Sequence, residues 1–273
     1  MALLSDPQTA LNLTRDDVIR QELVDIIEWH EHNQPRSLQK TLGPSEVGHP
    51  CLRHLGYKFL DVPDCNRPPW LGDVLPSAIG SAMHKRLESH FDAQNMRIGR
   101  VRWLTEMRVE PWPGLTGSCD LFDVDNGRVI DWKVLGDSSF KKMRKTPSIT
   151  YRRQIQLYGR GAELAGHDVR EVTLALIPKV GSLAGTKTIT VDYDPQVAAD
   201  LEARWWDFVC QVDDFKAEQH PGRIHWFPPI APEYADMCRV CPWFSEQPEV
   251  NPDMTSVRCA GLTVPKATAP AGA

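Results

Sequence analysis

Residues 115–134 read LTGSCDLFDVDNGRVIDWKV, two runs of strand-forming residues on either side of Asn126-Gly127. Asn-Gly between such runs is typical of a two-residue hairpin loop, because a type I′ turn needs φ > 0 at both central positions. This loop would place Asp120 opposite Lys133, with Asp131 diagonal from Asp120. Side chains alternate along a strand, so the three polar side chains would share one face of the hairpin.

Two carboxylates beside a lysine suit hydrolysis of a phosphodiester. Diagonal cross-strand neighbours lie about 7 Å apart, so Asp120 and Asp131 could reach one cation between them. Mg²⁺ or Mn²⁺ held by carboxylates polarises a phosphoryl oxygen and lowers the pKa of a bound water. Lys133 could orient or deprotonate that water and offset the developing charge. The alternative is an ordinary salt bridge between Asp120 and Lys133 on a solvated sheet face.

The flanking segments add polar residues at helical spacing. Residues 76–91 predict a helix, because apolar residues recur every four positions, and His84 and Glu88 would stack one turn apart along its side. Residues 150–160 also predict a helix, with Gln154 and Tyr158 on one face.

In order along the chain stand Gly80-x-x-x-His84, Gly117-x-x-Asp120, Asp131-x-Lys133 and Gln154-x-x-x-Tyr158. This series, within residues 76–165, resembles the motif set of the RecB-type nucleases of the PD-(D/E)XK superfamily. The resemblance implies an α/β fold with a mixed central sheet flanked by helices. It also implies metal ligation by His84, Asp120, Asp131 and the backbone carbonyl of Trp132, and catalytic roles for Asp120, Asp131, Lys133, Gln154 and Tyr158. For Glu88 and Glu106 we expect solvated charges, with a supporting role behind the ligands open to Glu106.

The chain has seven cysteines, and Cys238-Arg-Val-Cys241 has the spacing of a metal-binding pair. One cysteine before the predicted core and three after it resemble the iron–sulfur subset of RecB-type nucleases. That resemblance implies a structural [4Fe-4S] cluster held by Cys51, Cys238, Cys241 and Cys259. Cys259 follows Cys241 at a longer interval than is usual in the subset, so Cys65 is an alternative fourth ligand, and Zn²⁺ is an alternative to the cluster. Cys119 and Cys210 are expected in the core.

The net charge of −5 does not point to nucleic acid, but residues 138–162 carry seven basic side chains and no acid. Their place just after the predicted catalytic strand favours contact with a DNA backbone over a solvated charge run. The residues assigned to DNA are Lys141, Lys142, Arg144, Lys145, Arg152 and Arg153.

The length of 273 residues favours one large domain. We divide it into a helix and wrapping segment (1–75), a nuclease core (76–220), a cluster-binding segment (221–262) and a disordered tail (263–273). A helix over 15–31 is expected to begin at Thr14 and to turn Ile19, Leu23, Ile26 and Ile27 inward. Residues 34–75 are expected to be irregular.

Together these features predict a metal-dependent DNA exonuclease acting in recombination, repair or end processing, on DNA that is single-stranded or has free ends. A non-catalytic DNA-binding or assembly module and a CRISPR spacer-processing nuclease are the alternatives. The chain lacks a nucleotide-binding G-x-x-x-x-G-K-[ST] motif, so unwinding would need a helicase or recombination partner. The odd cysteine count and the lack of a signal peptide or long apolar run predict a soluble protein in a reducing intracellular setting, with no membrane association. The resemblance implies that this setting is a prokaryotic or phage-host cytoplasm.

Overall fold

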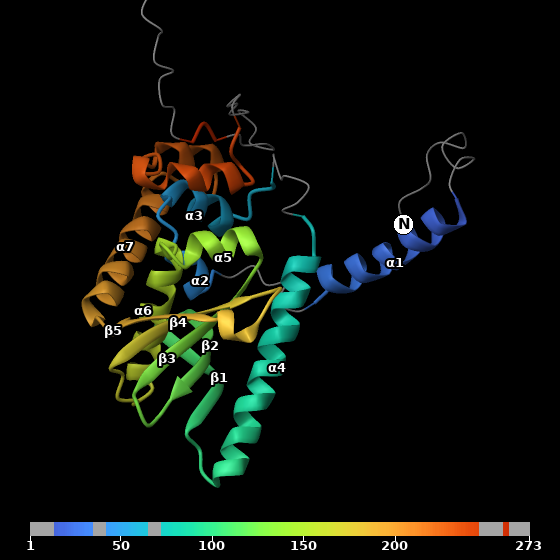
Figure 1. The fold of residues 1–273 in the computed structure, drawn as a ribbon. Helices are drawn as coiled ribbons and strands as arrows, with labels where there is room; N and C mark the ends of the chain where they lie inside the picture. The colour runs from blue at the N-terminus through green and yellow to red at the C-terminus, as the bar shows by residue number, and fades with distance from the viewer. Residues whose placement is uncertain (1–13, 35–41, 65–71, 246–258, 262–273) are drawn as a thin grey trace, which may run out of the picture.

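The computed structural model describes residues 14–34, 42–64, 72–245 and 259–261. Its centre is a five-stranded mixed sheet in the order β1-β2-β3-β4-β5, flanked by helices (Figure 1). The strands are β1 (Trp103–Trp112), β2 (Leu115–Asp123), β3 (Arg128–Leu135), β4 (Glu171–Pro178) and β5 (Lys187–Asp192). β3 and β4 run parallel and the other neighbouring pairs run antiparallel. The predicted α/β fold class, with a mixed central sheet flanked by helices, is confirmed.

Two long helices cover opposite faces of the sheet. Phe91 of α4 (Leu75–Ile98) stacks on Trp132 of β3 with ring centroids 5.6 Å apart. Tyr158 of α6 (Ile149–Leu164) instead joins the core cluster that contains Val129 of β3. Positions 129 and 132 point to opposite faces of a strand, so α4 and α6 lie on different sides of β3. Asp131 and Lys133 alternate with Trp132 and therefore belong to the α6 side.

The hairpin between β2 and β3 has a different register from the predicted one. Phe122 pairs with Val129 and Asp123 with Arg128, so the loop has four residues rather than two. The predicted two-residue loop was wrong: the pairing is shifted by two positions. A shift of two keeps every side chain on its face, because the side-chain period of a strand is two. Asp120, Asp131 and Lys133 therefore still share one face of the hairpin, as predicted.

A second core joins α3 to α7 and the C-terminal part of the described chain. Residues from α3 (Leu52–Phe59), α7 (Pro195–Asp214) and the C-terminal segment pack together, among them Leu55, Tyr57, Phe208, Phe227, Trp243 and Cys259. The C-terminal part also contains the short helices η4 (Pro221–Trp226) and η5 (Pro232–Val240). Residues 34–75 are not wholly irregular as predicted, because α3 and the short helix α2 (Pro44–Val47) form within them.

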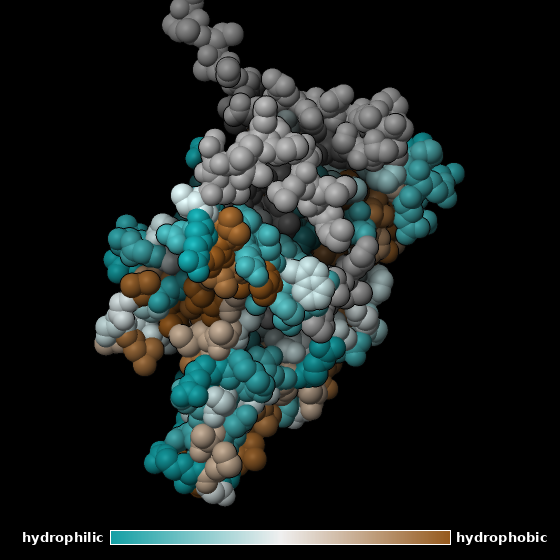
Figure 2. Space-filling model, turned by 90° about the vertical axis from the view of Figure 1, so that its right-hand side faces the viewer, coloured by the Kyte–Doolittle hydropathy of each residue, from teal (hydrophilic) through white to brown (hydrophobic). Residues whose placement is uncertain are grey.

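The first helix, α1 (Arg15–His32), begins with the predicted cap: Thr14 and Asp17 form a capping box. Its predicted packing is wrong, because Ile19, Leu23, Ile26 and Ile27 are exposed and α1 has no buried residue. Helical spacing predicts which residues share a stripe, but not that another element covers the stripe. On the side of the molecule that carries α1 and α4, hydrophobic side chains reach the surface among hydrophilic ones (Figure 2).

The basic segment includes a helix that the sequence did not predict. Helix α5 (Asp137–Met143) is held to the sheet by the buried Phe140. A short 3-10 turn, η3 (Leu183–Gly185), precedes β5. No helix among the described residues has the length and apolar content needed to cross a membrane.

Candidate active site

Asp120 and Asp131 lie where β2 and β3 separate. The ladder is last paired at Leu121 and Ile130, so the same register would next bring Asp120 opposite Asp131. Instead, the backbone N–H of Trp132 donates to Asp120 Oδ2 over 2.7 Å. The Asp120 carboxylate, rather than a backbone carbonyl of β2, accepts the hydrogen bond from this N–H of β3. This hydrogen bond fixes the direction of the Asp120 side chain beside Asp131. The ligand role of the Trp132 carbonyl stays a prediction.

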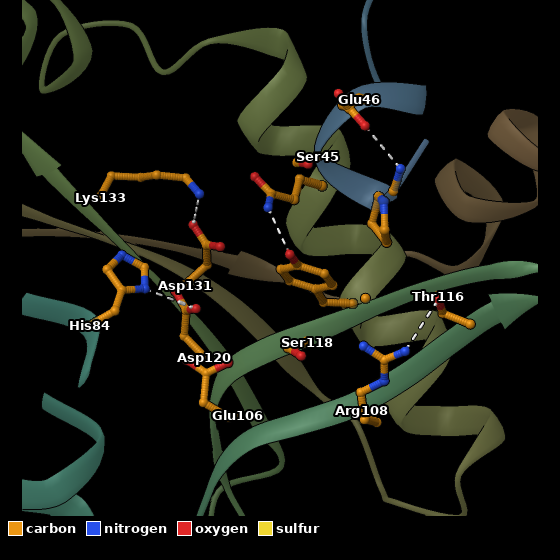
Figure 3. Close-up of a pocket in the computed structure, with 15 residues that line it drawn as sticks. Ser45, Glu46, His84, Glu106, Arg108, Thr116, Ser118, Asp120, Asp131 and Lys133 are labelled. Carbon is orange, nitrogen blue, oxygen red and sulfur yellow. Dashed lines mark hydrogen bonds and ion pairs between the residues drawn. The ribbon is translucent and has the colours of Figure 1, made fainter. Parts of the chain in front are cut away.

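His84 reaches the same point from α4. Its Nδ1 lies 3.2 Å from Asp120 Oδ1 (Figure 3). Burial by itself would lower the pKa of His84, but the hydrogen bond that its ring N–H donates to Asp120 and the charges of Asp120 and Asp131 outweigh burial and raise it. The negative charges around His84 therefore favour its protonated form, and they would favour a metal cation at the same place. His84 and Asp120 are 36 residues apart in the sequence, and they meet because α4 packs along β1, β2 and β3.

Lys133 is paired with Asp131 rather than with Asp120. The Nζ atom lies 2.8 Å from Asp131 Oδ2, and the two side chains are 17% and 2% exposed. The solvated Asp120–Lys133 salt bridge considered from the sequence is therefore wrong in both partner and setting. Burial raises the pKa of Asp131 despite the Lys133 charge, and the Asp120 charge adds to the rise.

The pKa of Lys133 is also raised. Burial favours the neutral amine, but the charge and hydrogen bond of Asp131 outweigh it. Lys133 Nζ also lies 4.8 Å from the centre of the Tyr151 ring. These contacts favour the ammonium form, which can donate hydrogen bonds and offset negative charge.

Gln154 and Tyr158 lie on the inner face of α6, as their spacing predicted. Gln154 Nε2 donates to the Tyr158 hydroxyl over 2.8 Å, and both residues are buried. Gln154 Oε1 has no hydrogen-bond partner among the described residues. A buried acceptor of this kind is costly unless water or a ligand donates to it. Both residues line the cavity that contains Asp120 and Asp131.

Two cavities meet at this site. A cavity of about 400 Å³ extends from the acids toward Ser45, Arg108 and Thr116. A larger groove of about 1070 Å³ runs along α4 and past Trp132 and Tyr151. The residues lining both are His84, Glu106 and Lys133. A polymer could therefore enter through the groove and pass the acids into the smaller cavity.

Glu106 is the residue to which sequence reasoning gave too little weight. The described residues contain one group of three or more potential metal ligands whose ligand atoms all lie within 4.8 Å of one another, and it comprises His84, Glu106 and Asp120. Glu106 is exposed and lies outside the motifs of the resembled family. Glu106 comes to the site through the pairing of β1 with β2, which brings it next to Asp120.

The basic residues assigned to DNA fall into two groups. Lys141, Lys142, Arg144 and Lys145 are exposed at and beyond the end of α5, and Lys141 is paired with Asp137 at 2.6 Å. Arg152 is exposed beside Tyr151, whose ring lines the groove. Arg153 is half-buried and donates to the Gly48 carbonyl over 3.1 Å, which ties α6 to the segment before α3. Their contact with DNA stays a prediction.

The four cysteines assigned to a cluster line one small cavity between α3 and the C-terminal segment. Cys51 caps α3, and its Sγ accepts from the His54 N–H over 3.5 Å. Cys259 is brought back to the C-x-x-C pair by a β-bridge with Phe244 and a hydrogen bond from its N–H to the Trp243 carbonyl, 2.6 Å long. Cys259 therefore lies near Cys238 and Cys241 in the structure despite the long interval between Cys241 and Cys259 in the sequence.

Burial disfavours the thiolate form at this cavity. It raises the pKa of Cys51, and it raises the pKa of Cys241 to about 12, with the neighbouring thiols adding to both shifts. A metal would reverse this preference, because metal binding supplies the positive charge that thiolates need. Cys65 lies outside the described residues. Cys119 is fully buried as predicted, whereas Cys210 is exposed and its predicted core position is wrong.

A scan of family models matches none to this chain, and no curated protein matches it either. Solved structures of similar fold include an alkaline exonuclease from Laribacter hongkongensis, with 15% identity and a TM-score of 0.37 over 51% of this chain and 70% of that one. A phage-related exonuclease from Haemophilus somnus has 13% identity and a TM-score of 0.39 over 62% and 82%. These similarities are distant, and the chemistry of the site follows from its own residues.

Proposed function

We propose that this chain is a metal-dependent DNA exonuclease of the RecB type that hydrolyses phosphodiester bonds and carries a structural iron–sulfur cluster. The observation that carries the proposal is the meeting of His84, Asp120, Asp131 and Lys133 at the junction of two cavities. These residues come from three different elements, and a histidine, two acids and a buried lysine converge there.

The donor set fits a divalent cation. The site offers two carboxylates and an imidazole, with the ring nitrogen of His84 against Asp120 and with Asp131 almost fully buried. Oxygen ligands suit Mg²⁺, and the nitrogen ligand makes Mn²⁺ at least as acceptable. When bound, such an ion supplies a water of lowered pKa and polarises the phosphoryl oxygen.

The protein residues then have distinct tasks. Asp120 is held in place by the Trp132 N–H, so its second oxygen is directed toward His84. Lys133 lies beside Asp131 and, as an ammonium, would offset the charge that develops on the phosphoryl oxygens. Gln154 has a buried Oε1 without a hydrogen-bond partner among the described residues, and its amide N–H donates to the Tyr158 hydroxyl. This pair would position the substrate strand.

The shape of the site favours a strand of DNA as substrate. The lining of the groove includes small residues of α4, among them Gly80 and Ser81, and the aromatic residues Trp132 and Tyr151. Aromatic rings give single strands a surface on which bases stack. The smaller cavity beyond the acids has room for a terminal nucleotide, which favours cleavage near an end.

We further propose that Cys51, Cys238, Cys241 and Cys259 hold a [4Fe-4S] cluster. The support for this proposal is that all four cysteines line one small cavity between α3 and the C-terminal segment. Four protein thiolates leave no position for substrate, so its role is structural.

Removing the metal tests the catalytic proposal. Protein treated with a chelator and desalted should leave linear DNA intact, because the buried lysine cannot replace the cation. Added Mn²⁺ or Mg²⁺ should restore release of acid-soluble nucleotides, and Ca²⁺ should not. A chelator-treated protein that digests DNA at the full rate would exclude the metal mechanism. Binding of DNA without digestion under every metal would favour the assembly module.

The basic residues after β3 give a separate prediction. Lys142, Arg144 and Lys145 are exposed and lie within three residues of one another, so they can follow a phosphate backbone. Replacing all three by Ala should flatten the dependence of log K on log salt by about 0.7 per lost contact on single strands. The measurement is fluorescence anisotropy at several salt concentrations. An unchanged slope would show that the three residues do not contact phosphates. Lys187→Ala on the exposed strand β5 is the matched control.

A further inference from the structure

His54 of α3 contacts the cysteines of both segments that form the cysteine cavity. Its ring Nδ1 lies 3.6 Å from Cys241 Sγ, and its backbone N–H donates to Cys51 Sγ over 3.5 Å. Cys51 precedes the sheet in the sequence and Cys241 follows it, so one residue touches a sulfur from each segment. Neither the proposed nuclease chemistry nor the proposed ligand set uses this histidine.

The His54 ring is held in one orientation by two other rings. It stacks on the His49 ring, with centroids 4.1 Å apart and planes inclined by 20°. It also packs against the buried ring of Trp243, with centroids 5.3 Å apart and planes inclined by 80°. His49 is itself tied to the same segment, because its Nδ1 accepts from the Cys51 N–H over 3.1 Å. The direction of the His54 Nδ1 toward Cys241 therefore follows from packing.

The lining of the cavity suits thiolates. Among the described residues that line it, Arg53 and His54 accompany the four cysteines and no acid is present. The Gly261 N–H donates to Cys259 Sγ over 3.4 Å, as the His54 N–H does to Cys51. Hydrogen bonds to sulfur stabilise its negatively charged form. The donor set therefore fits a centre that is bound by thiolates and carries net negative charge.

We propose that the ring N–H of His54 donates a hydrogen bond to the ligating Cys241 thiolate and thereby favours the reduced form of the cluster. A ligating thiolate has no proton, so the proton between the two atoms belongs to Nδ1. Reduction adds one negative charge to the centre, and a donor to a ligand sulfur stabilises the more negative state. The inference rests on the proposed cluster and is independent of the nuclease chemistry.

The test measures the reduction potential of the cluster in anaerobically purified protein. Dithionite, in the presence of redox mediators, adds one electron per cluster, while no covalent bond forms or breaks and the proton stays on Nδ1. His54→Phe keeps a ring beside His49 and Trp243 but has no N–H to donate. At the potential where half of the wild-type cluster is reduced, the ratio of reduced to oxidised cluster in His54→Phe should be lower by roughly threefold or more. An unchanged potential would overturn the inference.

His54→Asn tests the donor itself, because its amide nitrogen takes the place of Nδ1. It should keep the wild-type potential, whereas a purely structural role of the ring would lower the stability of both variants without separating their potentials. His220→Phe is the matched control, since it removes an exposed histidine outside the cavity and should leave the potential unchanged. A His54→Asn protein with the potential of His54→Phe would contradict the proposed hydrogen bond.

Iron and sulfide analysis of each variant separates a donor from a ligand. Both His54 variants should contain as much iron and sulfide as the wild type, and loss of the cluster from both would make His54 a ligand and overturn the inference. If His54→Phe alone assembles no cluster, the potential of His54→Asn decides: the wild-type value supports the inference and a shifted value overturns it. A wild-type protein without a cluster would overturn this inference together with the cluster proposal, and it would leave metal-dependent cleavage of DNA to its own test.

Discussion

Asp131→Asn and Lys133→Met should each reduce cleavage of DNA by roughly 10³-fold or more while leaving DNA affinity within a few-fold of wild type. In the proposed mechanism, Asp131→Asn removes the charge of a metal ligand, and Lys133→Met removes the ammonium that would offset charge on the phosphoryl group. Neither side chain supplies affinity for the strand, because both lie within the site, at 2% and 17% exposure.

The shapes of these substitutions matter because Asp131 and Lys133 are buried as a pair. Truncating one partner to Ala would leave the other charge buried and uncompensated, at a cost of about 3–5 kcal/mol. Asn and Met keep the volume, and the double variant removes both charges and should recover stability without recovering activity. Thermal melts and single-turnover cleavage rates, measured on the same preparations, separate the two effects.

Asp123→Asn provides the matched control for the pair. Asp123 is equally buried on β2, and its carboxylate is paired with Arg102 at 2.9 Å, but it does not line the catalytic cavity. It should lower the melting temperature and leave the cleavage rate of the folded protein unchanged. Full activity in Asp131→Asn or Lys133→Met would remove these residues from the mechanism.

Loss of any one cluster cysteine should lower the melting temperature by about 10 °C or more. Cys51 precedes the sheet, and Cys238, Cys241 and Cys259 follow it, yet all four line the same cavity. A shared centre would hold the segment before the sheet and the C-terminal segment together, and metal–thiolate bonding would contribute folding free energy directly.

Anaerobic purification followed by iron and sulfide analysis tests the cluster. Wild type should be brown, with about four iron and four sulfide per chain. Each cluster Cys→Ser variant should be colourless and less stable, whereas Cys119→Ser and Cys210→Ser should stay brown, since neither residue lines the cavity. A colourless wild type with stoichiometric zinc would refute the cluster and keep the ligand set. A Cys259→Ser protein that stays brown would indicate that Cys65, rather than Cys259, is the fourth ligand of the cluster.

The sequence predicted the sheet and its two covering helices well, because their signals are local. Strand-forming runs, the Asn126-Gly127 turn and the helical spacing of Gln154 and Tyr158 each depend on a few neighbouring residues. The hairpin loop was misjudged in length, since the turn dipeptide does not exclude a four-residue loop. The face shared by Asp120 and Asp131 was still correct because the shift was even.

What failed depends on tertiary contacts. The apolar stripe of α1 predicted a buried helix, but no described element covers Ile19 or Leu23. Cys210 was predicted to be buried because its neighbours on α7 are aromatic, yet it faces outward. Glu106 belongs to no motif, and only the pairing of β1 with β2 brings it opposite Asp120. Local patterns identify an element and its faces, whereas partners across the sheet follow from topology.

Digestion of matched linear and covalently closed circular DNA tests the exonuclease proposal most directly. Linear single strands, labelled at either end and incubated with Mn²⁺ or Mg²⁺, should be shortened progressively to acid-soluble nucleotides, and the circles should remain intact. The label that is released first gives the polarity. Failure of the wild-type protein to release nucleotides from linear DNA with either metal, or equal cleavage of linear and circular strands, would contradict a metal-dependent exonuclease.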